Sequence, residues 1–160
     1  MMSARTRWLV AAAIVAGAIL VGGMVDRLIV GSPAWRALGA GAWADYSRHA
    51  DLGAGLVAYP VEAIGATLLT LAAAVSQRLD RSPGRVRTAL YLSAAGYLAG
   101  LLLTLKAAPI MLALGNHGVA PAKAFADFYF WGLYLRGAVD AAASGRWPAH
   151  AAKVEAMKPI

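Results

Sequence analysis

Apolar residues in this chain fall into four long runs that are separated by short polar segments. The runs cover about residues 8–30, 52–75, 88–114 and 122–143. Each is long enough for a helix to cross the hydrocarbon core of a bilayer, which takes about 20 residues. The pattern therefore predicts an all-α integral membrane protein, a four-helix bundle that forms a single domain over residues 1–160.

The polar segments predict how the spans are joined. Ser32-Pro33 is typical of a helix start, with the serine as N-cap and the proline in the first turn. We therefore expect a short interfacial helix between spans one and two, followed by a turn near Gly39–Gly41. Trp43 is suited to the head-group layer at the entry to span two. Pro60 is expected to bend that span.

The first run follows two arginines, as the apolar core of a signal peptide does. Such a core has only about 7–15 residues, and the run here is longer, so we expect an uncleaved first helix. Small residues four apart favour close helix contact in membranes. They occur at Ala13/Gly17 and Ala18/Gly22 in the first run and at Gly96/Gly100 in the third.

Composition narrows the class further. The chain is 60% hydrophobic and 14% charged, with a mean hydropathy of +0.59. It has no cysteine, which excludes disulfides, thiolate catalysis, cysteine-bound zinc and iron–sulfur clusters. The net charge of +7 resides mainly at span ends, where basic residues meet lipid head groups. We therefore expect the lipid bilayer as a partner and no nucleic acid.

The distribution of lysine and arginine predicts the orientation, because loops that stay in the cytoplasm are enriched in both. The residues assigned to the inner side are Arg5, Arg7, Arg78, Arg81, Arg85, Arg87, Arg146, Lys153 and Lys158. Those assigned to the outer side are Arg27, Arg36, Arg48 and Lys123. We expect an integral protein of a bacterial inner membrane with both termini in the cytoplasm.

Three of the charged residues within the predicted spans come from three different spans and lie in the outer half of the bilayer. At 1.5 Å per helical residue, Glu62, Lys106 and Asp127 lie about 15, 12 and 7 Å from the outer side. Ionisable residues inside a membrane usually face a bundle interior or a wet cavity. Two interpretations remain open. The three could line a polar cavity open to the outer face, or Glu62 and Lys106 could form an ion pair that only holds two helices together.

Helical phase extends this group. Asp51 and Glu62 are eleven residues apart, or about three turns, so they share a stripe with Gly55 and roughly Tyr59. In the fourth run, Arg136 and Asp140 are spaced to pair near the inner interface.

Aromatic residues crowd the fourth run. Trp131 and Tyr134 share a face with Asp127. The run predicts either a wall for a flat aromatic or lipid-like substrate, or an ordinary mixture of core and lipid-facing residues.

The histidines lie outside the spans, so ligation of haem across the bundle is not expected. If a metal binds, His49 and His117 are its candidate ligands, but no HxxH or HxxxH spacing supports a metal site. The chain also lacks a nucleotide-binding loop and a nucleophile elbow. We expect no metal and no cofactor.

Several short motifs resemble the DUF1772 or anthrone-oxygenase-like family of small four-span membrane proteins. They are Trp43, Tyr46 and Arg48 at the entry to span two, Pro109 and Asn116 at the end of span three, and Trp131 and Arg136 in span four. The resemblance covers about residues 43–145. It implies oxidation of polyketide anthrones to anthraquinones with dioxygen as co-substrate and without a tightly bound cofactor.

On this basis we expect an oxygenase-like enzyme that acts on a hydrophobic small molecule. Glu62 or Asp127 would be the base, and Lys106, Asn116 or His117 would stabilise the developing oxyanion. The expected substrate-binding residues are Trp43, Arg48, Tyr59, Trp131, Tyr134 and Arg136. The alternative is a non-catalytic membrane helper or small carrier whose intramembrane charges are structural. A homo-oligomer remains open in both cases.

Overall fold

The computed structural model describes residues 2–80 and 84–144, which form helices joined by short turns, with no strand among them. Of the three short segments labelled η, η1 and η3 are π-helical, and η2 contains a kink at Gly53. The elements are α1 (Ala4–Asp26), η1 (Arg27–Gly31), α2 (Ser32–Leu38), α3 (Ala40–His49), η2 (Ala50–Ala54), α4 (Gly55–Leu79), α5 (Gly84–Gly115), α6 (Pro121–Phe128), η3 (Tyr129–Leu135) and α7 (Arg136–Ser144). The all-α prediction is confirmed for these residues.

Three helical stretches are long and apolar enough to cross a membrane. They are Ala4–Leu38, Ala40–Leu79 and Val86–Gly115, with mean hydropathies of 2.3, 1.6 and 1.8 over their most apolar windows. The fourth predicted span corresponds to α6, η3 and α7, which follow one another without a break but are not among these three. A membrane protein is therefore supported, while the four-span bundle stays a prediction.

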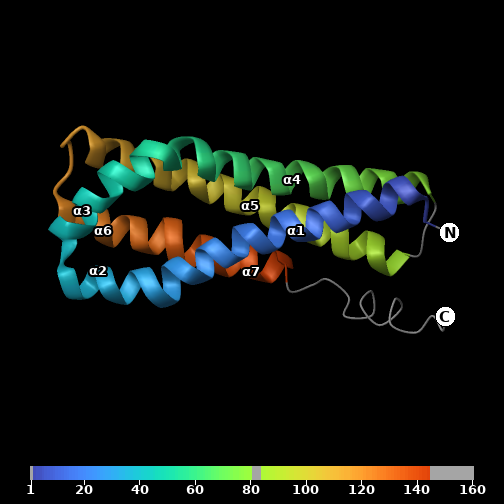
Figure 1. Ribbon diagram of the computed structural model, residues 1–160, viewed down its shortest axis with the longest axis horizontal. Coiled ribbons are helices and arrows are strands. Elements are labelled where there is room, and N and C mark those ends of the chain that lie inside the picture. Colours follow the sequence, from blue (N-terminus) through green and yellow to red (C-terminus); the bar gives the residue numbers. More distant parts are fainter. Residues whose placement is uncertain (1, 81–83, 145–160) are drawn as a thin grey trace.

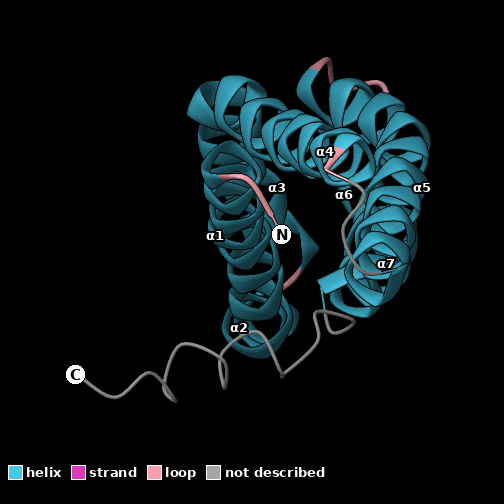
Figure 2. Ribbon diagram, turned by 90° about the vertical axis from the view of Figure 1, so that its right-hand side faces the viewer, coloured by secondary structure: helices cyan, strands magenta, loops and turns pink. Residues whose placement is uncertain are grey.

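The long helices lie side by side along the long axis of the molecule (Figure 1). Helix α1 packs against α4 and α7, α4 packs against α5, and α5 packs against α7. Seen from the end, these helices follow one another around an arc from α1 over α4 and α5 to α7 (Figure 2). Helices α2, α3 and the start of α6 gather at one end, opposite the beginning of α1 (Figure 1).

Small residues bring α1 and α4 together. Ala13 of α1 is buried in one apolar cluster with Ala73 and Ala74 of α4. Gly17 is also buried, so the first predicted pair of small residues lies inside the molecule. The second pair, Ala18 and Gly22, is exposed. Close approach through small side chains is the usual way in which membrane helices gain packing contacts.

The positions of the helix breaks differ from the expectation. Ser32 is not an N-cap, because α1, η1 and α2 run on continuously and the preceding Gly31 is itself helical. The turn near Gly39 is confirmed, since Gly39 has a φ of 91°, a conformation that glycine adopts without steric cost. The interruption before span two is at Gly53, with φ −90° and ψ −114°. Pro60 lies inside α4.

Candidate functional site

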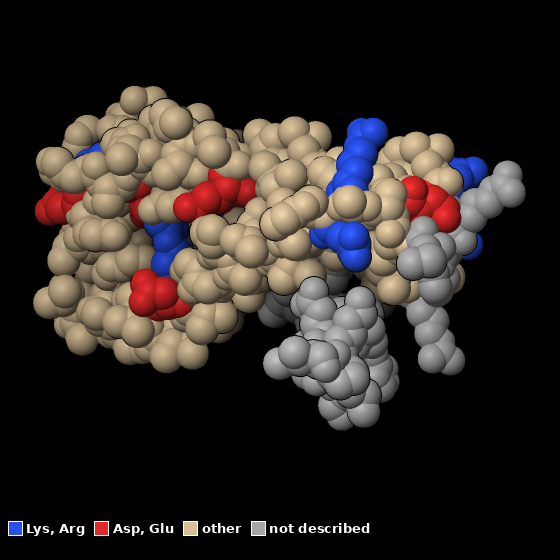
Figure 3. Space-filling view, turned by 45° about the vertical axis from the view of Figure 1, so that its right-hand side comes forward, with Lys and Arg blue, Asp and Glu red and all other residues tan. Residues whose placement is uncertain are grey.

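A cavity of about 220 Å³ lies between α1, α4, α5 and the η3–α7 segment. Its wall is mostly apolar, and its polar side chains come from every one of these helices. They are Arg27, Asp51, Tyr59, Glu62, Thr104 and Arg136. Figure 3 shows basic side chains deep in a hollow of the surface, with acidic side chains on both sides of it. The cavity therefore combines an apolar interior with a small set of charged groups.

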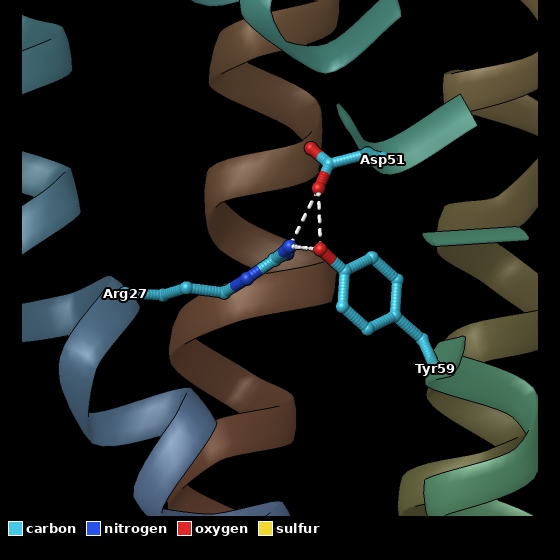
Figure 4. Close-up of polar contacts among 3 residues, drawn as sticks. All are labelled: Arg27, Asp51 and Tyr59. Atoms are coloured by element: carbon cyan, nitrogen blue, oxygen red, sulfur yellow. Dashed lines mark hydrogen bonds and ion pairs between the residues drawn. The ribbon is translucent and has the colours of Figure 1, made fainter. Parts of the chain in front are cut away.

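Arg27, Asp51 and Tyr59 form the most closely connected of these groups and point toward one another (Figure 4). Arg27 Nη2 donates to Asp51 Oδ1 at 2.5 Å and also to the Tyr59 hydroxyl. The Tyr59 hydroxyl in turn donates to Asp51 Oδ1 at 2.9 Å. The Arg27 guanidinium carbon lies 4.3 Å from the centroid of the Tyr59 ring, within range of a cation–π contact. The cluster ties the end of α1 to the start of α4.

The cluster is shielded from solvent. The Asp51 side chain is 6% exposed and that of Arg27 is 19% exposed. Asp51 Oδ2 is buried and has no hydrogen-bond partner within the described part of the chain. A buried polar atom without a partner is costly and needs an explanation, such as a ligand that completes it.

The three η segments lie at or beside these side chains. Arg27 is the first residue of η1, Asp51 lies in η2, which is kinked at Gly53, and Arg136 follows directly after η3. A π-helical turn, as in η1 and η3, adds a residue to the helix and changes the direction in which the next side chains point, and such turns are frequent at functional sites. Each η segment among the described residues thus contributes to one cavity or adjoins a residue that does.

Gly55 provides the room that Tyr59 needs. A Cβ at Gly55 would lie 2.5 Å from Tyr59 Cε2, closer than two carbon atoms can approach without displacement. The glycine therefore allows the tyrosine ring to lie against the first turn of α4. In that position its hydroxyl reaches both Arg27 and Asp51.

A second buried pair lies behind the cavity. Arg136 Nε donates to Asp140 Oδ2 at 3.4 Å, and both side chains are buried. This pairing was predicted from their spacing. A Cβ at Gly100 would lie 2.5 Å from Asp140 Oδ1, so the second glycine of the GxxxG motif makes room for this carboxylate.

The three intramembrane charges that were expected to meet do not share this cavity. Glu62 lines it. Lys106 is exposed, with Nζ 6.0 Å from the centroid of the Trp131 ring, and Asp127 pairs with Lys123 at 2.5 Å. Glu62 and Lys106, which are both described, form no ion pair, so the alternative interpretation is not realised either. The stripe from Asp51 through Gly55 and Tyr59 to Glu62 does line the cavity together.

The expected outer residues lie at a different place. Asn116 and His117 are exposed after the end of α5, and His117 has a φ of 55°. His117 and Arg48 line a second, open depression, separate from the cavity. Arg48 pairs with Asp45 at 2.9 Å, and His49 Nδ1 lies 2.8 Å from the Asp45 carbonyl oxygen. No group of three or more potential metal ligands occurs among the residues that the structure describes.

Some of the predicted substrate-binding residues line the cavity, and others lie elsewhere. Tyr59 and Arg136 line the cavity. Trp43 is completely buried and packs on Phe125 and Phe128, with ring centroids 5.1 and 5.8 Å apart. Tyr134 is exposed, and its hydroxyl accepts a hydrogen bond from Arg36 at 3.0 Å. Trp131 is partly buried beside the same core.

Arg27 is the site residue that sequence reasoning missed. It lies within the predicted first span, residues 8–30, but was counted only among the basic residues of the outer side. The available signal was the apolar stretch Leu28–Val30 that follows, since a charge between two apolar stretches of one helix belongs to the span. Asp51 had been placed on the correct stripe, but not assigned to the site.

Comparison of the chain with protein-family models, with curated proteins and with solved structures finds no match. The resemblance to the anthrone-oxygenase-like family therefore stays a prediction.

Proposed function

We propose that this chain is a four-span integral membrane protein that binds an amphipathic small molecule in the cavity between α1, α4, α5 and α7. The observation that carries this proposal is the Arg27–Asp51–Tyr59 cluster, which lies buried beside an otherwise apolar cavity. A few polar groups in a mostly apolar hollow are typical of sites for small molecules. Ionisable residues inside a membrane bundle commonly mark such sites.

The dimensions of the cavity favour an elongated ligand. Its volume of about 220 Å³ is below the roughly 300–1,000 Å³ of sites that enclose a whole drug-sized molecule. Leu56 and Leu112 contribute to its wall and are more than half exposed, so the cavity reaches the outer surface between helices. The polar end of a ligand would therefore lie inside, and its apolar remainder would extend into the lipid.

The binding proposal is tested by photolabelling in phosphatidylcholine nanodiscs. The probe is a diazirine-tagged dodecanol, and labelled peptides are identified by mass spectrometry. Ala108, which lines the cavity, is replaced in Ala108→Trp to occupy the hollow. Leu105, which is on the same helix but 70% exposed, is replaced in the matched control Leu105→Trp. Labelling of cavity residues that Ala108→Trp abolishes and Leu105→Trp preserves supports binding. Equal labelling of both variants would refute it.

The proposed topology places Pro121–Ser144 as the fourth span and both termini in the cytoplasm of a bacterial cell. The distribution of lysine and arginine supports it, as does the packing of α7 against α1 and α5. The chain has no cysteine, so a single introduced one reports its own side. A membrane-impermeant maleimide should label intact cells that carry Ala120→Cys but not those that carry Ser3→Cys or Ser144→Cys. Labelling of Ser3→Cys but not of Ala120→Cys would contradict the orientation, and labelling of both Ala120→Cys and Ser144→Cys would contradict the fourth span.

A second candidate is the oxidation of a hydrophobic aromatic substrate, which the family resemblance implies. Glu62 favours it, because this carboxylate lines the same cavity as Tyr59 and could remove a proton from a bound substrate. For an anthrone the reaction is anthrone plus dioxygen to anthraquinone plus water. Oxygen consumption by purified protein with anthrone should then fall strongly in Glu62→Gln. Equal rates in both proteins would leave the non-catalytic helper or carrier as the better description.

A further inference from the structure

The two arginines at the cavity carry hydrogen-bond donors that the protein does not use. Arg27 makes its hydrogen bonds through Nη2 only, and Arg136 makes its one through Nε. Among the described residues, Nε and Nη1 of Arg27 and both Nη atoms of Arg136 have no hydrogen-bond acceptor. Each guanidinium nitrogen carries hydrogen and none can accept. These N–H groups are therefore available to a ligand that carries acceptor oxygens.

The charges at the cavity limit the charge of the ligand group that can accept hydrogen bonds from these arginines. The lining residues include two cations, Arg27 and Arg136, and two anions, Asp51 and Glu62, so their formal charges sum to zero. Arg27 and Arg136 line one cavity and carry like charges, which repel each other, and Arg136 Nε lies 3.4 Å from Oδ2 of its partner Asp140. A single negative charge between the arginines would relieve this repulsion. A doubly charged group would in addition repel Glu62 and Asp51.

Guanidinium groups match one class of monoanion best. Their planar N–H groups bind the two oxygens of a carboxylate side by side. Such charge-assisted hydrogen bonds are roughly twice as strong as those between neutral groups. A neutral ester or alcohol could accept hydrogen bonds from the same nitrogens but would leave the repulsion between the arginines in place.

Building on the proposed binding of an amphipathic molecule, we infer that its head group is a carboxylate held between Arg27 and Arg136. The tail passes along the apolar wall formed by residues such as Met24 and Met111 and leaves beside Leu56 and Leu112. Tyr59 and Asp51 position the Arg27 guanidinium, since both bind the same Nη2 atom and leave its other nitrogens for the ligand. The ligand class is therefore an amphipathic monocarboxylate, of fatty or aromatic type.

The test is a competition series against the diazirine-tagged dodecanol in nanodiscs that contain unmodified protein. The competitors are dodecanoate, methyl dodecanoate, dodecanol, dodecyltrimethylammonium and dodecyl phosphate, at equal mole fractions in the lipid. The pH is about 8.5, well above the ordinary carboxyl pKa of about 4. Dodecanoate should displace the probe at a mole fraction at least about tenfold lower than the ester or the alcohol, a ratio that corresponds to about 1.4 kcal/mol.

Two variants locate the preference. In Arg136→Gln/Asp140→Asn neither partner is left as an unpaired buried charge, and the advantage of dodecanoate over dodecanol should disappear while dodecanol still competes. Arg36→Gln changes an arginine outside the cavity and should keep the full advantage. If the double variant does not fold, the series on the unmodified protein decides the question alone.

The possible outcomes separate the two proposals. Equal competition by all uncharged and charged heads, or strongest competition by the phosphate or the ammonium, would overturn the carboxylate inference and leave the binding proposal intact. A probe that labels no cavity residue would overturn the binding proposal and the inference with it. Retention of the dodecanoate advantage in the folded double variant would show that Arg136 does not hold the head group.

Discussion

Removal of the Asp51 charge should destabilise this protein more than any comparable change at its surface. Asn is nearly isosteric with Asp, so Asp51→Asn removes the charge without creating a hole. It leaves the Arg27 guanidinium, whose side chain is 19% exposed, without its anion. Breaking a buried ion pair by removing one partner costs about 3–5 kcal/mol. We expect about 3 kcal/mol, because the adjoining cavity gives water some access to the cation.

Two further variants show whether the cost comes from the pair. Arg27→Met combined with Asp51→Asn removes both charges and should be more stable than Asp51→Asn alone, since no unpaired charge remains. Asp45→Asn is the matched control, because Asp45 pairs with Arg48 at 2.9 Å but its side chain is 75% exposed. Such surface pairs contribute about 0–1 kcal/mol.

The measurement is unfolding of the purified protein by increasing SDS in mild-detergent micelles, followed by the fluorescence of its five tryptophans. The free energies of unfolding of the single and double variants form a double-mutant cycle. A loss for Asp51→Asn no larger than that for Asp45→Asn would refute the reasoning. So would a double variant less stable than the single one, because the cost would then arise from packing and not from an unpaired charge.

Further predictions concern packing, pH and the predicted base. Gly100→Ala should lower the free energy of unfolding by about 1–3 kcal/mol, because the added Cβ would lie 2.5 Å from Asp140 Oδ1. In the control Gly65→Ala the added Cβ has nothing within 4 Å, and both variants are measured in the same unfolding assay. Hydrogen bonds from the Thr6 hydroxyl and from the backbone amide of Ser3 lower the pKa of Asp80 below its ordinary 3.8. Its contribution to stability is therefore complete above about pH 4 and is lost as the pH falls through the lowered value. Acid titration of the unfolding midpoint should show this loss, and Asp80→Asn should flatten it. Asp127→Asn should change the free energy of unfolding by no more than about 1 kcal/mol and should leave photolabelling of the cavity unchanged. A loss of labelling would show that Asp127 contributes to the site.

The helices could be predicted from the sequence because hydropathy reports directly on length and burial in lipid. The predicted third span, 88–114, lies within α5 (Gly84–Gly115), and the fourth, 122–143, coincides closely with Pro121–Ser144. The start of α2 could not be predicted in this way. Ser32-Pro33 is a local capping signal. The preceding helix continues through Gly31, however, so the backbone N–H groups at this point bond within the helix and no side-chain cap is needed.

The site was only partly predictable, because depth along a helix does not give direction around it. Glu62 and Lys106 were expected at similar heights, and both are exposed, yet Glu62 borders the cavity while Lys106 lies beside Trp131. Within one helix the direction can be calculated from the helical period, which is why the stripe from Asp51 to Glu62 was correct. Between helices the direction depends on packing, and no periodicity within a single run contains that information.

The π-helical segments were beyond prediction for a related reason. One extra residue in a turn does not change the hydropathy of a span, so η1 and η3 leave no trace in the pattern of apolar residues, and neither does the kink at Gly53 in η2. Their effect is nevertheless large, since they lie at or directly beside Arg27, Asp51 and Arg136. Charges that hydropathy assigns to a loop or to a helix end are thereby turned toward one interior cavity.

A purely structural role for the Arg27–Asp51–Tyr59 cluster explains fewer of its features than ligand binding does. Charges that serve only to hold helices together are most stable when every donor and acceptor is paired inside the protein. Here Asp51 Oδ2 has no partner among the described residues, and both arginines leave donors unused beside an apolar cavity. The buried Asp51 oxygen costs stability, and the unused arginine N–H groups gain partners when a ligand with acceptor oxygens enters. The structure therefore favours a site that is completed by its ligand over a cluster that is complete by itself.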